Sequence, residues 1–330
     1  MAGRNIMIKY FLISGLLLFS LMPISGCISQ YTPEDHTAVL GITKTTLNIS
    51  LDEKPEFIAI SAGKAVNHYI GLRSNGTVSA QCIQNQRAIC SVPKNLTDVI
   101  AISAGHQYSL ALKRDGTVVF WGVPDNSKQI PTLANRNEIS NITAISAGTA
   151  HSLVLTNDGT VVAKGSTKCG ALDVPENLTN VTAISAGGLH NLALKDDGTV
   201  VAWGDECERG WLVEQGQADI PKNLTDVVAI AAGLDHSLAL KRDGTIVAWG
   251  NNEYGQSVVP KNLKGVVAIS AGYRHNLALK RDGTVTAWGE NNVGQCDVPI
   301  NLTDVIAISA GGTQSVALKK DGTIVVWGRK

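Results

Sequence analysis

The stretch Val266–Gly289, VVAISAGYRHNLALKRDGTVTAWG, is one copy of a unit that occurs seven times in the chain. Each copy is marked by the glycine that follows its Ser-Ala or Ala-Ala pair. This glycine falls at Gly63, Gly105, Gly148, Gly187, Gly233, Gly272 and Gly311, in steps of 42, 43, 39, 46, 39 and 39 residues. A fixed period near 40 residues is typical of a solenoid or a propeller.

Three short runs within the unit, 266–271, 275–280 and 284–288, interleave apolar residues with small or polar ones. This period of two predicts strands. Asp282-Gly283 separates the second run from the third and favours a tight hairpin, because glycine adopts positive φ without steric cost. A 3.6-residue period is missing from the unit, which argues against helical repeats. The sequence therefore predicts an all-β fold, a seven-bladed β-propeller with the Ala- and Ser-rich first run innermost.

The repeated pattern A-I-S-A-G-x-x-H-S-L-A-L-K-x-D-G-T-V-V-A-W-G resembles the repeats of the regulator of chromosome condensation. Its period of 39 residues also resembles that of the β-lactamase-inhibitor protein II propeller. The likeness covers about residues 50–330 and implies a propeller. It implies little about function, because this superfamily includes a nucleotide-exchange factor and an enzyme inhibitor.

Residues 1–26 have the features of an export signal peptide, with basic residues before a short apolar run. Cys27 directly follows Ile-Ser-Gly and resembles the lipidated cysteine of bacterial and archaeal lipoproteins. We therefore expect a lipid anchor at Cys27, a linker over 27–45 and the propeller over 46–330, outside the cell membrane. An uncleaved anchor helix is the alternative, although the apolar run is short for a bilayer span. We expect Leu47–Leu51 to pair with the last blade and close the ring.

The charge balance bears on the class of partner. The chain has 28 basic and 28 acidic residues, and residues 1–26 contain two of the basic ones and none of the acidic ones, so 26 and 28 remain after cleavage. Without a cluster of Lys and Arg, such a surface lacks the electrostatic footprint of a nucleic-acid-binding protein. We therefore predict no nucleic-acid partner and no role on chromatin.

Repeated positions explain several residues that could suggest chemistry. Five units carry a histidine just after the two-residue turn that follows the repeated glycine. Each histidine belongs to a separate blade, so we expect hydrogen bonds within or between blades rather than a metal site. Five tryptophans share one position and are expected to pack between blades. These residues are His68, His151, His190, His236, His275, Trp121, Trp203, Trp249, Trp288 and Trp327. Outside the repeated positions we find no motif for catalysis, and we predict no enzyme activity, no metal and no cofactor.

The cysteines leave two alternatives open. With Cys27 lipidated, five cysteines remain in an oxidising compartment. Cys82 and Cys90 could bridge within one loop, and Cys169 and Cys207 between neighbouring blades, leaving Cys296 free; alternatively, all five are free thiols. The repeated Asn-Leu-Thr sequences are glycosylation sequons only if the host glycosylates exported proteins. We favour the interpretation that they form turns.

Following the chain through one blade assigns its turns to opposite faces. The two-residue turns after each repeated glycine share one face with the loops after each Trp-Gly pair, and we name it the variable face. The Asp-Gly-Thr and Asn-Leu-Thr turns share the other, the repeated face. Units five and six agree at 18 of 24 positions, yet Leu234-Asp235 in one turn corresponds to Tyr273-Arg274 in the other. Variation on a repeated scaffold is where specificity is usually built, although neutral drift is the alternative.

Interface hot spots favour exposed Trp, Tyr and Arg. On the variable face, outside repeated positions, the candidates are Trp211, Tyr254, Tyr273 and Arg274, with His106 and Asp235 as polar neighbours. All except His106 come from blades four to six and are predicted to form one arc. We predict a membrane-anchored module that binds an extracytoplasmic protein. Glycan or cell-surface binding and a structural spacer are alternatives, and β-lactamase inhibition is what the resemblance alone implies.

Overall fold

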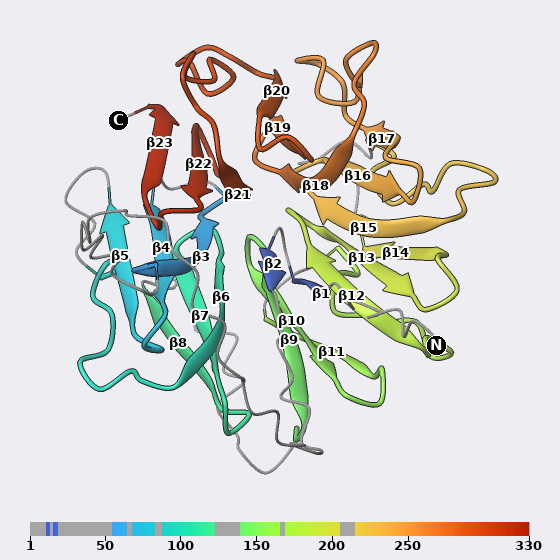
Figure 1. Cartoon of the computed structure of the whole chain (residues 1–330). Helices are drawn as coiled ribbons and strands as arrows, with labels where there is room; N and C mark the ends of the chain where they lie inside the picture. Colours follow the sequence, from blue (N-terminus) through green and yellow to red (C-terminus); the bar gives the residue numbers. More distant parts are fainter. Residues whose placement is uncertain are drawn as a thin grey trace, which may run out of the picture.

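Seven small sheets surround a central axis in the computed structural model of the chain (Figure 1). The structure describes residues 11–13, 16–18, 55–64, 68–82, 88–122, 139–165, 169–204 and 215–329. Within these ranges all regular secondary structure is β, and none of it is a helix that could cross a membrane. The predicted all-β, seven-bladed propeller is therefore confirmed.

Each blade is a three-stranded antiparallel sheet whose strands follow one another in the chain. The inner strands are β3 (Phe57–Ala62), β6 (Val99–Ala104), β9 (Ile142–Ala147), β12 (Val181–Ala186), β15 (Val227–Ala232), β18 (Val266–Ala271) and β21 (Val305–Ala310). The middle strands are β4 (His68–Arg73), β7 (Tyr108–Lys113), β10 (His151–Thr156), β13 (His190–Lys195), β16 (His236–Lys241), β19 (His275–Lys280) and β22 (Gln314–Lys319). The outer strands are β5 (Val78–Cys82), β8 (Val118–Gly122), β11 (Val161–Gly165), β14 (Val200–Gly204), β17 (Ile246–Gly250), β20 (Val285–Gly289) and β23 (Ile324–Gly328).

Two further strands, β1 (Phe11–Ile13) and β2 (Leu16–Leu18), form a separate antiparallel hairpin near the middle of the ring (Figure 1). They lie beside the inner strands of the blades. The predicted signal peptide and linker, residues 1–26 and 27–45, otherwise fall outside the described residues. So does Leu47–Leu51, and its predicted pairing stays a prediction.

The blades are tied to one another by a closed ring of backbone hydrogen bonds. In every blade the N–H that follows the repeated glycine donates to the carbonyl of the next blade's repeated glycine, at 2.9–3.3 Å. Gly312 of blade seven donates to Gly63 of blade one, which closes the ring directly. Only glycine fits at these positions, because the backbone of the next blade lies too close for a side chain. A Cβ on Gly272 would lie 2.4 Å from the carbonyl oxygen of Gly311 and 2.9 Å from the His275 ring.

A second ring, formed by serines of the inner strands, lies beside the first. Each serine hydroxyl oxygen accepts the N–H of an inner-strand alanine in the next blade, at 2.9 Å. The serines are Ser61, Ser103, Ser146, Ser185, Ser270 and Ser309. Blade five has Ala231 at this position, so it offers no such acceptor to Ala271. The Ala- and Ser-rich first run is thus innermost, as predicted.

The hydrophobic core lies between blades. Between blades four and five, Leu192 and Leu194 of the middle strand pack against Val227, Ile230 and Trp249 of the following blade. Other pairs of neighbouring blades repeat this arrangement. Four of the five tryptophans also donate to a loop carbonyl of the preceding blade, as Trp249 Nε1 does to Gln217 of blade four at 2.9 Å. Their predicted role in packing between blades is confirmed.

Candidate functional site

The structure confirms which turns share a face. On the repeated face, the N–H of Arg281 in the hairpin turn of blade six donates at 2.8 Å to the carbonyl of Gly265, which precedes the inner strand. On the variable face, the N–H of Glu290 after the outer strand donates at 2.8 Å to the carbonyl of Arg274 in the two-residue turn. The same contacts recur in other blades, so the two sets of turns lie at opposite ends of the strands.

Arg274 is held between two tyrosines on the variable face. Its guanidinium carbon lies 4.8 Å from the ring centroid of Tyr254 and 5.3 Å from that of Tyr273. Its Nη1 also donates to the Tyr254 hydroxyl at 3.2 Å. Stacked cations of this kind interact with aromatic faces within about 6 Å. Two different segments, the blade-six turn and the loop after β17, therefore assemble one pre-organised cluster.

Asp235, from the blade-five turn, adds a negative charge beside this cluster. Burial raises the pKa of its carboxyl, and the nearby Arg274 guanidinium opposes this shift. All four side chains are half-buried and retain surface that a partner could cover. We name Asp235, Tyr254, Tyr273 and Arg274 the Arg274 cluster.

The other predicted site residues are not part of the Arg274 cluster. His106 lies in the blade-two turn, away from blades five and six, and its N–H donates to the Gly148 carbonyl at 3.3 Å. Trp211 and Cys27 lie outside the described residues. The prediction overlooked Val293, which occupies the position in the blade-six loop that Tyr254 has in blade five and is 41% exposed. Aligning the loop 251–256, NNEYGQ, with the loop 290–295, ENNVGQ, pairs Tyr254 with Val293 and could have identified it.

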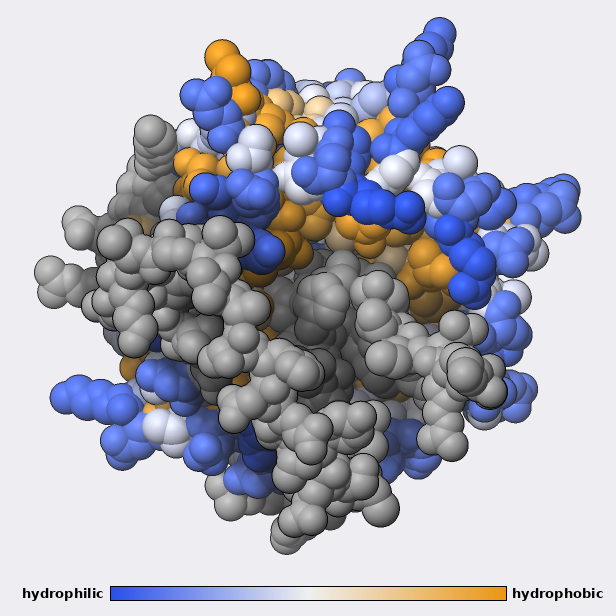
Figure 2. Space-filling view, viewed as in Figure 1, coloured by the Kyte–Doolittle hydropathy of each residue, from blue (hydrophilic) through white to orange (hydrophobic). Residues whose placement is uncertain are grey.

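The surface of the propeller is mixed in character. Figure 2 shows hydrophilic side chains projecting around the molecule, with apolar surface between them. In the part of the chain that the structure describes, the exposed large apolar residues are Ile58, Val258, Val293 and Ile300. Val258 follows Tyr254 in the loop after β17, and Val293 occupies the equivalent of the Tyr254 position in the loop after β20, so it adds apolar surface to the variable face one blade further on.

The histidines beneath the variable face form links between blades, as predicted. His236 Nε2 is 2.7 Å from Asn276 Oδ1 of the next blade, and His275 Nε2 is 2.9 Å from Ser315 Oγ. Tyr108 and Gln314 replace histidine in two blades and also bond to the next blade. Burial lowers the pKa of His236 to about 4 and that of His275 to about 3. Among the described residues, no three His, Cys, Asp or Glu side chains are grouped in a way that could hold a metal ion.

The cysteines are partly oxidised. Cys82 and Cys90 form a disulfide with Cα atoms 6.0 Å apart. Cys169 is also disulfide-bonded, and Cys207, its proposed partner, lies outside the described residues. Cys296 is a free thiol. The structure therefore favours the alternative with disulfides over that with five free thiols.

Comparison with known proteins gives the family. Residues 87–330 match the sequence family described as the RCC1-like domain. The chain belongs to this family. No sequence among the curated proteins matches the chain significantly.

Solved structures resemble this RCC1-like propeller in fold. Prp20p from Saccharomyces cerevisiae is 20% identical, with a TM-score of 0.62 over 79% of this chain and 82% of that one. The ectodomain of the receptor kinase CR4 from Physcomitrella patens is 20% identical, with a TM-score of 0.65 over 82% and 72%. The CRINKLY WD40 ectodomain of the Arabidopsis thaliana receptor kinase ACR4 is 19% identical, with a TM-score of 0.62 over 83% and 98%. At such identities the likeness shows the fold alone.

Proposed function

We propose that this RCC1-like propeller is a membrane-anchored, extracytoplasmic module that binds a protein through its variable face. The observation that carries the proposal is the Arg274 cluster. A guanidinium stacked between two tyrosines offers the residue types that dominate protein interfaces, already held in place before binding. Val293, exposed at the equivalent loop position of the next blade, offers apolar surface of the kind found in interface centres.

The cysteine chemistry supports an extracytoplasmic location. Disulfides persist in oxidising compartments and are rare in the cytosol of most organisms. The Cys82–Cys90 bridge and the oxidised Cys169 agree with the export signal proposed for residues 1–26. Lipidation of Cys27 would then retain the protein at the membrane surface.

The path of the chain favours a variable face that points away from the membrane. The chain enters the first blade on the repeated face, where the Ser74 N–H donates to the Glu56 carbonyl at 3.1 Å. The segment between Cys27 and this point has 28 residues. Such an anchor places the repeated face nearer the lipid and leaves the variable face accessible.

Related propellers support a protein as the partner. The structure of Prp20p is described together with its binding to Gsp1p and histones. The plant relatives are ectodomains of receptor kinases. Our proposal for this chain is a binding role without catalysis, since the buried histidines are already used in bonds between blades. Glycan binding is the alternative that the experiment must separate.

The proposal is tested by comparing three purified baits: the unchanged protein, a Tyr273→Ala/Arg274→Ala variant, and a Lys280→Ala/Arg281→Ala control on the repeated face of the same blade. Each bait is exposed to detergent-extracted surface proteins of the source cell and to a glycan array. We expect a protein that is captured by the first and third baits and lost with the second. Equal capture by all three, or binding to glycans alone, would contradict the proposal.

A further inference from the structure

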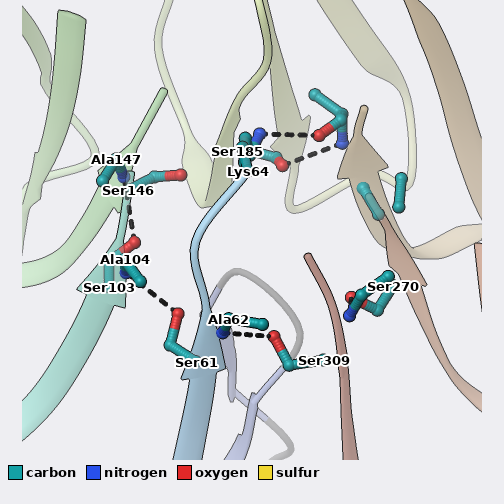
Figure 3. A pocket seen from close by; sticks show the side chains of 14 residues that line it. Ser61, Ala62, Lys64, Ser103, Ala104, Ser146, Ala147, Ser185, Ser270 and Ser309 are labelled. Carbon is teal, nitrogen blue, oxygen red and sulfur yellow. Dashed lines mark hydrogen bonds between the residues drawn. The ribbon is translucent and has the colours of Figure 1, made fainter. Parts of the chain in front are cut away.

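The axis of the propeller contains a small cavity of about 30 Å³ (Figure 3). Serine and alanine residues of the inner strands line it, together with one charged residue, Lys64. A space of roughly 10–15 Å³ is enough for one water molecule. The cavity is therefore large enough for a single small ion or a few waters and too small for an organic ligand.

The lining serines have hydrogens left to donate. Each of the six serine oxygens already accepts an N–H from the next blade. A hydroxyl has one donor hydrogen and two acceptor lone pairs, so accepting one bond leaves the donor hydrogen available. The ring of serines thus presents hydrogen-bond donors around the axis.

Lys64 adds a positive charge without a matching negative one. Its side chain reaches from blade one across the axis, and Nζ donates to the carbonyls of Ala186 and Ala232 in blades four and five. Lys64 is only 9% exposed. Among the described residues it has no ion pair with a carboxylate. A buried charge without a counter-ion is costly, and burial accordingly lowers the pKa of Lys64 to about 7.

We propose that the axial cavity binds one small monovalent anion, such as chloride, as the counter-ion of Lys64. A metal cation is disfavoured because the Lys64 ammonium already occupies the carbonyls of Ala186 and Ala232. A divalent oxyanion is disfavoured by the size of the cavity and by the single positive charge among the described residues that line it. Lys64 itself links blade one to blades four and five, and the anion stabilises this link by neutralising its buried charge. Lys64, the two carbonyls and the six serines all belong to the blades.

The first measurement is thermal unfolding of the purified protein at constant ionic strength, with chloride or bromide replacing gluconate, which is too large for the cavity. We expect Tm to rise saturably by roughly 2–4 °C for the unchanged protein. Lys64→Gln should abolish the rise, whereas Lys320→Gln, at an exposed lysine on the repeated face, should retain it. If Lys64→Gln does not fold, Ser103→Ala replaces it and should reduce the apparent affinity for chloride.

The second measurement locates the ion. Crystals grown in bromide should show an anomalous peak on the axis, within hydrogen-bonding distance of Lys64 Nζ or the serine hydroxyls. The proposal is overturned if the axis holds water alone, or if Tm responds to chloride equally in the Lys64 and Lys320 variants. A bromide peak without any saturable change in Tm would mean an adventitious ion only, and would also contradict it.

Discussion

The variable and repeated faces are built from the same seven sheets, yet their turns are held in different ways. On the repeated face a side chain makes the turn: an Asp or Asn oxygen accepts the N–H of the threonine two residues later in every blade, at 2.9–3.1 Å. On the variable face the ring of glycine carbonyls is bonded by backbone N–H groups alone. The turn is therefore independent of the side chain that follows the glycine.

This difference explains why one face can vary. Replacing the turn aspartate removes the bond that shapes its hairpin, so that sequence repeats. The bond that closes the ring uses only the N–H of the residue after the repeated glycine, so its side chain is free to differ, and in blade one that of Lys64 bonds blades four and five instead. Lysine, histidine, threonine, leucine, tyrosine and glycine all occur there. The propeller thus separates the bonds that close the ring from the side chains that we propose to bind a partner.

The largest expected effect contrasts two glycines of blade six that lie on opposite faces. Gly272→Ala places a Cβ 2.4 Å from a neighbouring blade's backbone, so we expect the free energy of unfolding to fall by about 3 kcal/mol or more. A Cβ on Gly265 would contact no other atom, and only the positive φ of +70° disfavours alanine there. We therefore expect Gly265→Ala to lower the free energy of unfolding by about 1 kcal/mol. Urea unfolding measures both. Equal costs would show that close approach in the glycine ring does not limit the fold.

The two faces should also respond to acid in separate pH ranges. Burial holds the pKa of His236 near 4 and that of His151 near 4, below the ordinary value of 6.5. The unfolded chain then binds more protons, so stability is present above pH 6.5 and is lost as pH falls toward 4, by about 1.4 kcal/mol per pH unit for each such histidine.

On the repeated face, hydrogen bonds from threonines lower the pKa of turn aspartates such as Asp243 and Asp282. Their contribution is lost only below the unfolded carboxyl pKa of about 4.

His236→Gln tests this separation with a residue that the chain itself uses, because Gln314 occupies the same position in blade seven. We expect urea unfolding to show a shallower loss of stability between pH 6.5 and 4 in this variant. Asp243→Asn is the control and should leave that range unchanged. If the two variants have the same pH profile as the unchanged protein, the buried histidines are not the source of acid sensitivity.

The smallest expected effect concerns the gap in the serine ring. Ala231→Ser would supply the missing acceptor for Ala271, and we expect a gain of about 1 kcal/mol, since one intramolecular hydrogen bond contributes that much. Ser270→Ala makes the opposite change in the next blade and should destabilise by a similar amount. Thermal unfolding measures both, and a loss of stability in Ala231→Ser would contradict the role given to this ring.

The repeats were sufficient to predict the propeller, because strand period, Asp-Gly turns and a fixed spacing all depend on local sequence. The prediction that histidines and tryptophans join blades was also confirmed. The stacking of Arg274 between Tyr254 and Tyr273 could not be derived, since it joins a turn and a loop of different blades. Lys64 was overlooked for a related reason: its partners are 122 and 168 residues away in the chain, and spacing alone does not show that its side chain crosses the axis.

The central claim is that the variable face binds and the repeated face does not. Its most direct test is the Kd of the captured partner for the unchanged protein, for Tyr273→Ala/Arg274→Ala and for Lys280→Ala/Arg281→Ala, measured by surface plasmon resonance. We predict that the first variant weakens binding by about 2 kcal/mol, or roughly 30-fold, with an unchanged Tm, and that the second binds normally. Normal binding by the first variant, or equal loss in both, would contradict the account.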